Sequence, residues 1–207
     1  MIGSGLQALK DWVFQQVCKG KEMKAQGENA LEIVTREPKC FLQSPPRIKN
    51  NESAQEADSR AAPCVVIVMR KAGVRGRERN EEDNQISEAR RGFLEVQLLF
   101  VTYDPGHRTA ESQEKSAYEK INDNTEEAVK TVLIWAEETM NKLIRAGSIP
   151  GTGWAVEKNT WEYGMLADET GYLADRWPLY YAALSGTFTT ESLEQGVQKD
   201  DLSSILD

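Results

Sequence analysis

This chain of 207 residues is poor in histidine and cysteine, two side chains that often bind metals or act as nucleophiles. It has one histidine, His107, in a polar turn, and three cysteines that are widely spaced and form no Cys-x-x-Cys pair. This composition indicates neither a histidine cluster for a metal, nor a His-centred nucleophile, nor a disulfide framework. We therefore expect no metal, no cofactor and three reduced cysteines that serve packing: Cys18, Cys40 and Cys64.

Long apolar runs are also scarce, and positive charges are fewer than negative ones. No stretch approaches the roughly 20 apolar residues that span a bilayer, and the first residues lack the basic start and apolar core of a signal peptide. We therefore expect a cytoplasmic protein that does not enter a membrane. The 25 Lys and Arg residues against 33 Asp and Glu residues give a net charge of -8, which disfavours general attraction to a phosphate backbone.

A phosphate-binding loop is missing as well. The glycine-rich segment 147–153 lacks both the lysine and the preceding strand that such a loop needs. It is predicted to be a connecting loop.

Alternating or continuous apolar patterns predict several strands. Residues 63–69 are apolar on both parities, which is typical of a central strand covered on both faces. In residues 92–103 and 176–190, apolar side chains alternate with polar ones, as in antiparallel strands with one face in the core. Shorter strands are predicted within residues 30–37 and 154–163.

Two helices are predicted from their start and stop signals. The first covers residues 4–20, with Ser4 and Gln7 as a capping box and Gly20 as a left-handed stop. The second begins at Asn124, carries an apolar stripe for roughly 22 residues and ends before Gly147.

The remaining stretches are rich in charged and small residues. Residues 43–62 and 72–91 are predicted to be flexible loops, and residues 192–207 a mobile acidic C-terminal tail. We expect a single α+β domain over residues 1–191, with a mostly antiparallel sheet of four to five strands packed against two main helices.

This order of elements resembles that of a known protein family. The hairpin strands at residues 64–71 and 93–103, the long helix after a turn, and Trp177-Pro178-Leu179-Tyr180-Tyr181 leading the last strand resemble the tail-terminator, or tail-completion, proteins of long-tailed bacteriophages. The resemblance covers about residues 4–190 and lies in the layout, because the family has no catalytic motif to match.

The resemblance implies a structural virion protein and not an enzyme. It implies a ring, expected to be a hexamer, at the head-proximal end of the tail tube, which ends tube polymerisation and joins the tail to the head. Its partners would be copies of itself, the tail-tube protein and head-tail connector proteins, and assembly would take place in the cytoplasm of the bacterial host. DNA would pass through the ring without specific binding, for which an acidic chain is suited.

Two groups of residues are candidates for contacts between proteins. Trp177 and Tyr181 flank the entry to the last strand, and large aromatic side chains often anchor interfaces. Arg75, Arg77 and Arg79 form the densest basic cluster, although the acidic residues that follow favour a solvated loop that is neutralised internally.

Two other functions remain open. One is another head-tail connector or neck protein. The other is a small metal-dependent nuclease, which needs clustered carboxylates for Mg²⁺. Its candidate ligands are Glu95, Asp104, Asp168, Glu169 and Asp175, of which Glu95 lies on a predicted strand without the lysine that such nuclease cores contain.

Overall fold

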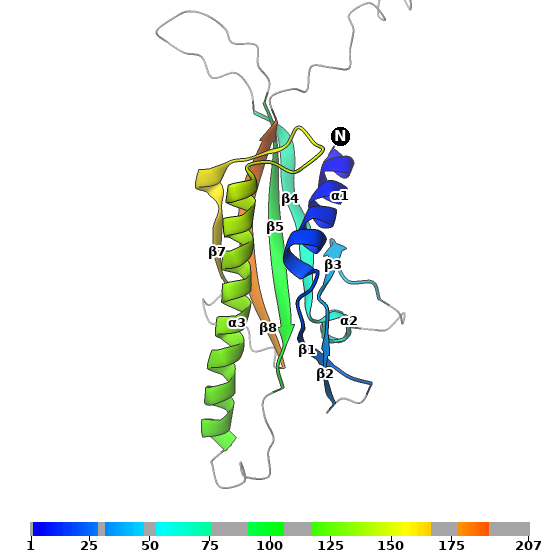
Figure 1. The fold of residues 1–207 in the computed structure, drawn as a ribbon, viewed down its shortest axis with the longest axis vertical. Coiled ribbons are helices and arrows are strands. Elements are labelled where there is room, and N and C mark those ends of the chain that lie inside the picture. Colours follow the sequence, from blue (N-terminus) through cyan, green and yellow to red (C-terminus); the bar gives the residue numbers. More distant parts are fainter. Residues whose placement is uncertain are drawn as a thin grey trace, which may run out of the picture.

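The core is built on a six-stranded mixed sheet, seen in a computed structural model that describes residues 2–28, 32–47, 53–75, 91–105, 117–166 and 178–190 (Figure 1). The strands run in the order β3-β4-β5-β8, and β6 and β7 both pair with the other edge of β8. The strands are β3 (Lys39–Leu42), β4 (Cys64–Arg75), β5 (Arg91–Tyr103), β6 (Ala155–Val156), β7 (Glu162–Met165) and β8 (Leu179–Thr190). The β3–β4 pair is parallel and the other pairs are antiparallel.

A separate two-stranded ribbon packs against this sheet. It consists of β1 (Met23–Gln26) and β2 (Ile33–Arg36), which pair antiparallel, and β1 contacts β5. An ion pair of 2.8 Å from Lys24 Nζ to Asp104 Oδ2 joins β1 to the segment just after β5.

Two helices cover one face of the sheet (Figure 1). They are α1 (Ile2–Val13), which continues into a π-helical turn at Phe14–Cys18, and α3 (Ala117–Ala146). Alternation along β5 directs Leu94, Leu98 and Phe100 toward them, where they are fully buried with Leu9 of α1 and Val132 of α3. We call this the helix side of the sheet.

The opposite face is covered in part by a short helix, α2 (Ala54–Ala61). Ala61, the last residue of α2, and Ala62, which follows it, pack on the side chains that point to this face, with Val66 of β4 and Tyr181 of β8 among the buried neighbours. The sheet therefore has a second, smaller core on this face.

The predicted fold class is confirmed: the protein is α+β, with three α-helices in the described part of the chain. The strands predicted over residues 63–69, 92–103 and 176–190 are present as β4, β5 and β8. β4 lies between β3 and β5 over residues 64–67, as predicted for a central strand, but no described strand pairs with its outer side over residues 68–75. The sheet differs from the prediction in having six strands and in being mixed, because β3 and β4 run parallel. The connection through α2 allows this parallel pairing.

Residues 43–62, predicted to be a loop, include α2. Ser53 Oγ accepts a hydrogen bond of 3.2 Å from Glu56 N, and Glu56 Oε2 accepts one of 2.8 Å from Ser53 N. This reciprocal capping box stabilises the start of a short helix inside a polar stretch.

The other boundaries differ in smaller ways. The first helix begins at Ile2, so Ser4 is inside it, and Gly20 with φ of 78° ends the helical region as predicted. The long helix begins at Ala117 and has 30 residues. The strand predicted over residues 154–163 is interrupted by a 3-10 turn at Lys158–Thr160, which separates β6 from β7. The loop predicted over residues 72–91 is shorter than predicted, because residues 72–75 belong to β4 and Arg91 to β5. Residues 76–90 and 192–207 are outside the described residues.

In the described part of the chain, no helix is long and apolar enough to cross a membrane.

Candidate functional site

The acidic residues considered as metal ligands do not form a common site. No group of three His, Cys, Asp or Glu residues within the described ranges is placed to hold a metal ion. Glu95 and Asp104 are separated by nine residues of extended chain, which is about 30 Å, and Asp104 is paired with Lys24. The remaining candidates, Asp168, Glu169 and Asp175, lie outside the described residues, as does His107.

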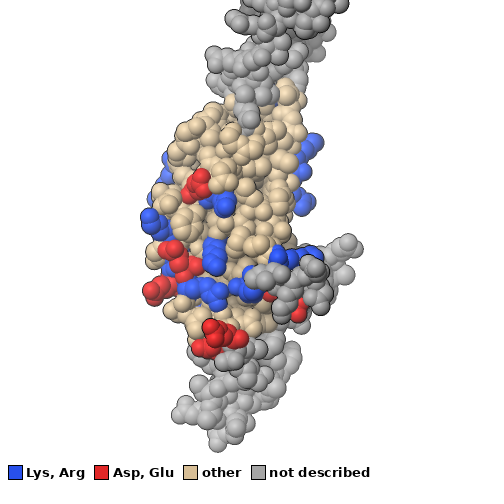
Figure 2. All heavy atoms as spheres, turned by 90° about the vertical axis from the view of Figure 1, so that its right-hand side faces the viewer, with Lys and Arg blue, Asp and Glu red and all other residues tan. Residues whose placement is uncertain are grey.

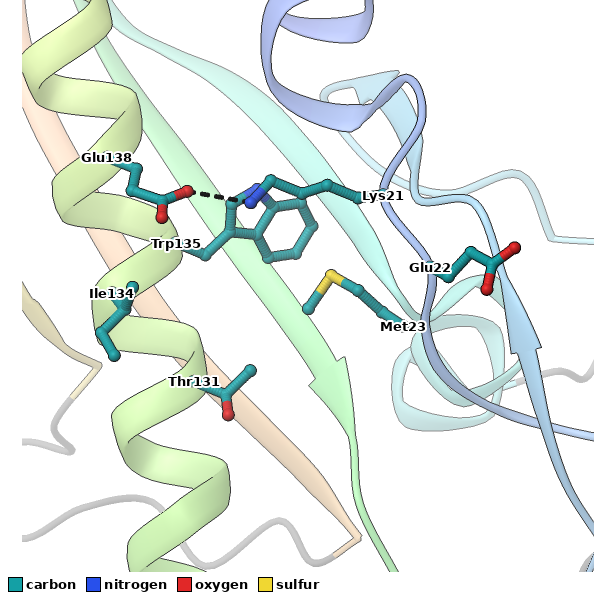
Figure 3. Close-up of a pocket in the computed structure, with 7 residues that line it drawn as sticks. All are labelled: Lys21, Glu22, Met23, Thr131, Ile134, Trp135 and Glu138. Atoms are coloured by element: carbon teal, nitrogen blue, oxygen red, sulfur yellow. Dashed lines mark hydrogen bonds and ion pairs between the residues drawn. The ribbon is translucent and has the colours of Figure 1, made fainter.

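A surface groove lies between α3 and the start of β1. Its volume is about 340 Å³ (Figure 3). We call it the Trp135 groove, and it is lined by Lys21, Glu22, Met23, Thr131, Ile134, Trp135 and Glu138.

The floor of the groove is the buried side chain of Trp135. Trp135 is 2% exposed, and its Nε1 donates a hydrogen bond of 3.4 Å to the carbonyl oxygen of Val17. Its ring meets Phe100 edge to face, with centroids 5.1 Å apart. Contacts on both sides thus hold the indole in place, and Met23 faces it from the opposite wall (Figure 3).

The rim of the groove combines one ion pair with one exposed apolar side chain. Lys21 reaches from the β1 side across the indole and forms an ion pair of 2.9 Å with Glu138 Oε2 on α3 (Figure 3). Ile134 is 54% exposed. Ile134 and the half-buried Met23 thus place apolar side chains beside a charged rim, an arrangement that interfaces also have.

The side chains that line the groove are mainly apolar or charged. Its lining contains no histidine or cysteine, and the only hydroxyl, on Thr131, donates a hydrogen bond of 2.9 Å to the carbonyl oxygen of Glu127 in its own helix. The arrangement can accept an apolar side chain over Trp135 and Met23, with Lys21 and Glu138 available to polar groups at the rim.

Tyr181, a predicted interface residue, lies inside the subunit. It is 6% exposed, and its hydroxyl donates a hydrogen bond of 2.9 Å to Asp58 Oδ2 of α2. In this conformation Tyr181 has little surface to offer a neighbouring subunit and instead ties β8 to α2.

The other predicted contact residues can be placed only in part. Arg75 is the last residue of β4 and stands opposite Arg91 in the register. Trp177, Arg77 and Arg79 lie outside the described residues. Of the predicted contact residues that the structure describes, neither Tyr181 nor Arg75 lines the Trp135 groove.

The sequence pattern did not predict the groove, because an apolar stripe along a helix such as α3 is typical of one buried face. The buried positions include Val132, Trp135 and Leu143, so Ile134, next to Trp135 in sequence, is turned outward. An isoleucine one position outside a buried stripe was the available signal, since apolar positions of a surface helix normally recur at three and four residues.

No protein-family model matches the chain, and no curated protein matches it in sequence. The functional inference therefore depends on the chain's own residues and on its layout.

Proposed function

We propose that this chain is a structural subunit of the tail-terminator type. In this proposal, copies of the chain form a closed ring, expected to contain six, that caps the tail tube of a long-tailed bacteriophage and joins it to the head. The subunit acts by contact with other proteins and carries out no catalysis. DNA passes through the ring without sequence-specific binding.

The layout of the subunit supports this proposal. The resemblance depended on a hairpin, a long helix and a last strand, and the corresponding elements are β4 with β5, α3 and β8. They belong to an α+β fold, which is the class that the family implies.

The observation that carries the proposal is Ile134 at the rim of the Trp135 groove. A ring that closes by rotation uses two different surfaces of each subunit, one fitting the other on its neighbour. The groove offers one such surface, because an exposed isoleucine lies beside a buried tryptophan that packs on Phe100. An apolar side chain of the next subunit that covers Ile134 and Met23 would remove their surface from water, which stabilises association.

The mass and shape of the purified protein test the proposal. Light scattering after size exclusion, with and without the tail-tube protein of the same phage, is expected to give one discrete multiple of the 23.2 kDa subunit, and electron microscopy is expected to show rings. A protein that stays monomeric under both conditions would contradict the structural function.

The position of the subunit in the virion separates the proposed function from a general neck protein. Labelled subunits are expected at the junction of the tail tube with the head-joining proteins, in contact with the last ring of the tube. A label confined to the head side of that junction would instead support a connector. Cleavage of DNA in the presence of Mg²⁺ by the pure protein would support the nuclease alternative.

A further inference from the structure

The outer edge of β4 is paired over only part of its length. β3 pairs with it from Cys64 to Ile67, and the last bond is from Gln43 N to the carbonyl oxygen of Ile67, at 2.9 Å. The chain then turns away at Gln43, whose φ is 68°. No described strand pairs with the outer edge of β4 over residues 68–75, which we call the open edge.

The side chains of the open edge are unusual for an edge that faces water. Met69 is 38% exposed and Val74 is 49% exposed. The register places Met69 opposite Val96 and Val74 opposite Gly92, so both lie on the helix side of the sheet. Edges that avoid pairing are normally protected by charge, proline or bulges, and this edge does have a bulge between Met69 and Lys71. Its exposed Met69 and Val74 are nevertheless apolar side chains that a further strand would cover.

Positive charge accompanies these apolar residues. Arg70 and Lys71 are exposed and form no ion pair with a described residue, although Lys71 Nζ lies 5.8 Å from the ring centroid of Phe93. Figure 2 views the side of the molecule next to this edge, and its upper right margin carries Lys and Arg without Asp or Glu beside them.

The charge restricts which strand can add to the open edge. If two copies paired β4 to β4, their Arg70 and Lys71 side chains would be brought together, and like charges in facing strands are destabilising. An acidic strand with apolar residues fits the open edge better.

Such a segment follows β8 directly. Residues 191–207 contain five acidic residues and one lysine, together with Leu193, Val197, Leu202, Ile205 and Leu206. β8 ends at Thr190, which stands opposite Gly92 of β5, and Gly92 stands opposite Val74 at the far end of β4. The C-terminal segment therefore starts at the end of the sheet where the open edge lies.

We propose that residues 191–207 turn back and add to β4 as an antiparallel strand along the open edge of the same chain. The new strand would lie three strand spacings from β8, which is about 14 Å and takes about five extended residues to cross. The remaining residues are enough to pair with residues 68–75. The direction follows from β4 and β8 both being antiparallel to β5, so a chain that leaves β8 must reverse to run beside β4.

In this arrangement the acidic pair Asp200 and Asp201 lies near Arg70 and Lys71, and apolar residues of the segment cover Met69 and Val74. The inference does not depend on ring formation. The alternative to this pairing is that the edge stays unpaired, because the charges of Arg70 and Lys71 keep other strands away.

Hydrogen exchange measured by mass spectrometry on the full chain tests the proposal. In an antiparallel strand, about half of the amides point away from β5, and in residues 68–75 these amides have no described acceptor. With the segment paired, we expect them to exchange at least about tenfold more slowly than unprotected amides. Exchange at the unprotected rate throughout the outward amides would overturn the proposal.

Charge variants identify the occupant. The variant D200K/D201K is expected to lose the protection, and so is R70E/K71E, whereas the combination of all four changes is expected to regain it. The matched control E191K/E194K makes the same change in net charge as D200K/D201K, but in the first residues after β8, which cross to the open edge without pairing. It is expected to keep the protection. Equal loss in the control, or no regain in the combination, would overturn the pairing of these groups.

Concentration distinguishes the same chain from a second copy. Protection within one chain is expected to be unchanged over a hundredfold dilution that leaves the protein monomeric by light scattering. Protection that disappears with dilution would place a second copy on the open edge and overturn the proposal as stated.

Discussion

The indole of Trp161 lies directly against the backbone of Gly186. A Cβ at Gly186 would be 2.2 Å from Cδ2 of Trp161, closer than any real contact. Trp161 is 9% exposed and packs edge to face on Phe188, with ring centroids 5.2 Å apart. The glycine in β8 therefore makes room for the tryptophan that covers the sheet between β6 and β7.

Replacing Gly186 by alanine is expected to lower the free energy of unfolding by about 2 to 3 kcal/mol, because an overpacked core must shift a large ring. The matched control is Gly164→Ala in β7, where an added Cβ meets nothing within 4 Å, and where we expect a change within about 1 kcal/mol in either direction. Urea denaturation monitored by tryptophan fluorescence measures both. Equal stability of the two variants would contradict the close packing of Trp161 on Gly186.

The bond from Tyr181 to Asp58 predicts a second stability effect. The change Tyr181→Phe removes a hydrogen bond to a carboxylate and is expected to lower the free energy of unfolding by about 1 to 2 kcal/mol. In the control Tyr163→Phe the ring is 39% exposed, and the expected change is within about 0.5 kcal/mol. Thermal denaturation by circular dichroism compares them, and similar melting temperatures would indicate that the bond adds no stability.

The buried cysteines predict a loss of stability in alkaline solution. Burial, followed by the effect of Cys40, raises the pKa of Cys18 to about 12, and burial raises that of Cys40 to about 12, both from 9.0. Because the folded thiols hold their protons more tightly than the unfolded ones, their contribution is complete below pH 9 and is lost as the pH rises toward 12. Each thiol is expected to reduce the free energy of unfolding by about 1.4 kcal/mol per pH unit in this window.

Urea titrations under reducing conditions between pH 8 and pH 11 check this dependence. Burial and then Asp104 also raise the pKa of Tyr103, so the decline does not come from thiols alone. The variant Cys40→Ala lacks one titrating thiol, so its free energy of unfolding is expected to fall less steeply with pH than that of the unchanged chain. A slope identical to that of the unchanged chain would show that Cys40 does not titrate as its burial implies.

Ile134 predicts an effect on assembly without an effect on folding. The change Ile134→Asp places a charge beside the Trp135 groove, and we expect the dissociation constant of the ring contact to rise at least about tenfold, which corresponds to about 1.4 kcal/mol. Asn141→Asp adds the same charge at another exposed position of α3 and is expected to leave assembly unchanged. Both variants should unfold within about 1 kcal/mol of the original chain.

Analytical ultracentrifugation gives the dissociation constants for this comparison. If both variants assemble as the original chain does, the groove is not the ring contact. If both fail equally, net charge and not the groove explains the loss.

The long strands were predictable because their side chains have two different environments. In β5 the alternation of Leu94, Val96 and Leu98 with Glu95 and Gln97, continued by Phe100, indicates both the strand and its buried face. The four apolar residues on that face are at most 1% exposed. In β8 the same pattern gives Leu184 and Phe188, both fully buried. Local sequence is sufficient when each face of a strand has its own chemistry.

The short elements were not predictable in the same way. β3 forms a strand because it pairs with β4, which follows it in sequence only after helix α2. The four residues of β3 carry no pattern that indicates this distant partner. Helix α2 buries little apart from alanines such as Ala57 and Ala61, so its composition resembles that of a loop, although the capping box of Ser53 and Glu56 marks its start.

The candidate site was less predictable than the fold. The Trp135 groove joins residues 21–23 to residues 131–138, which come together only when both segments pack on the sheet. Sequence patterns indicate that Trp135 is apolar, but not which side chain faces it. Tyr181 was predicted to contact another subunit, but it is buried in its own subunit and its hydroxyl donates a hydrogen bond to Asp58. Sequence alone does not separate an aromatic side chain that packs inside from one that faces a partner.

The central position of β8 has a consequence for the synthesis of the protein. β8 is the last described strand to leave the ribosome, yet it lies between β5 on one side and β6 and β7 on the other. A nascent chain that has not reached Thr190 can form the β4–β5 hairpin, but β5 then has a bare flank and α3 has an incomplete surface to pack on. We expect such chains to be clients of chaperones until β8 emerges, since unpaired strands in unfinished domains are prone to aggregate.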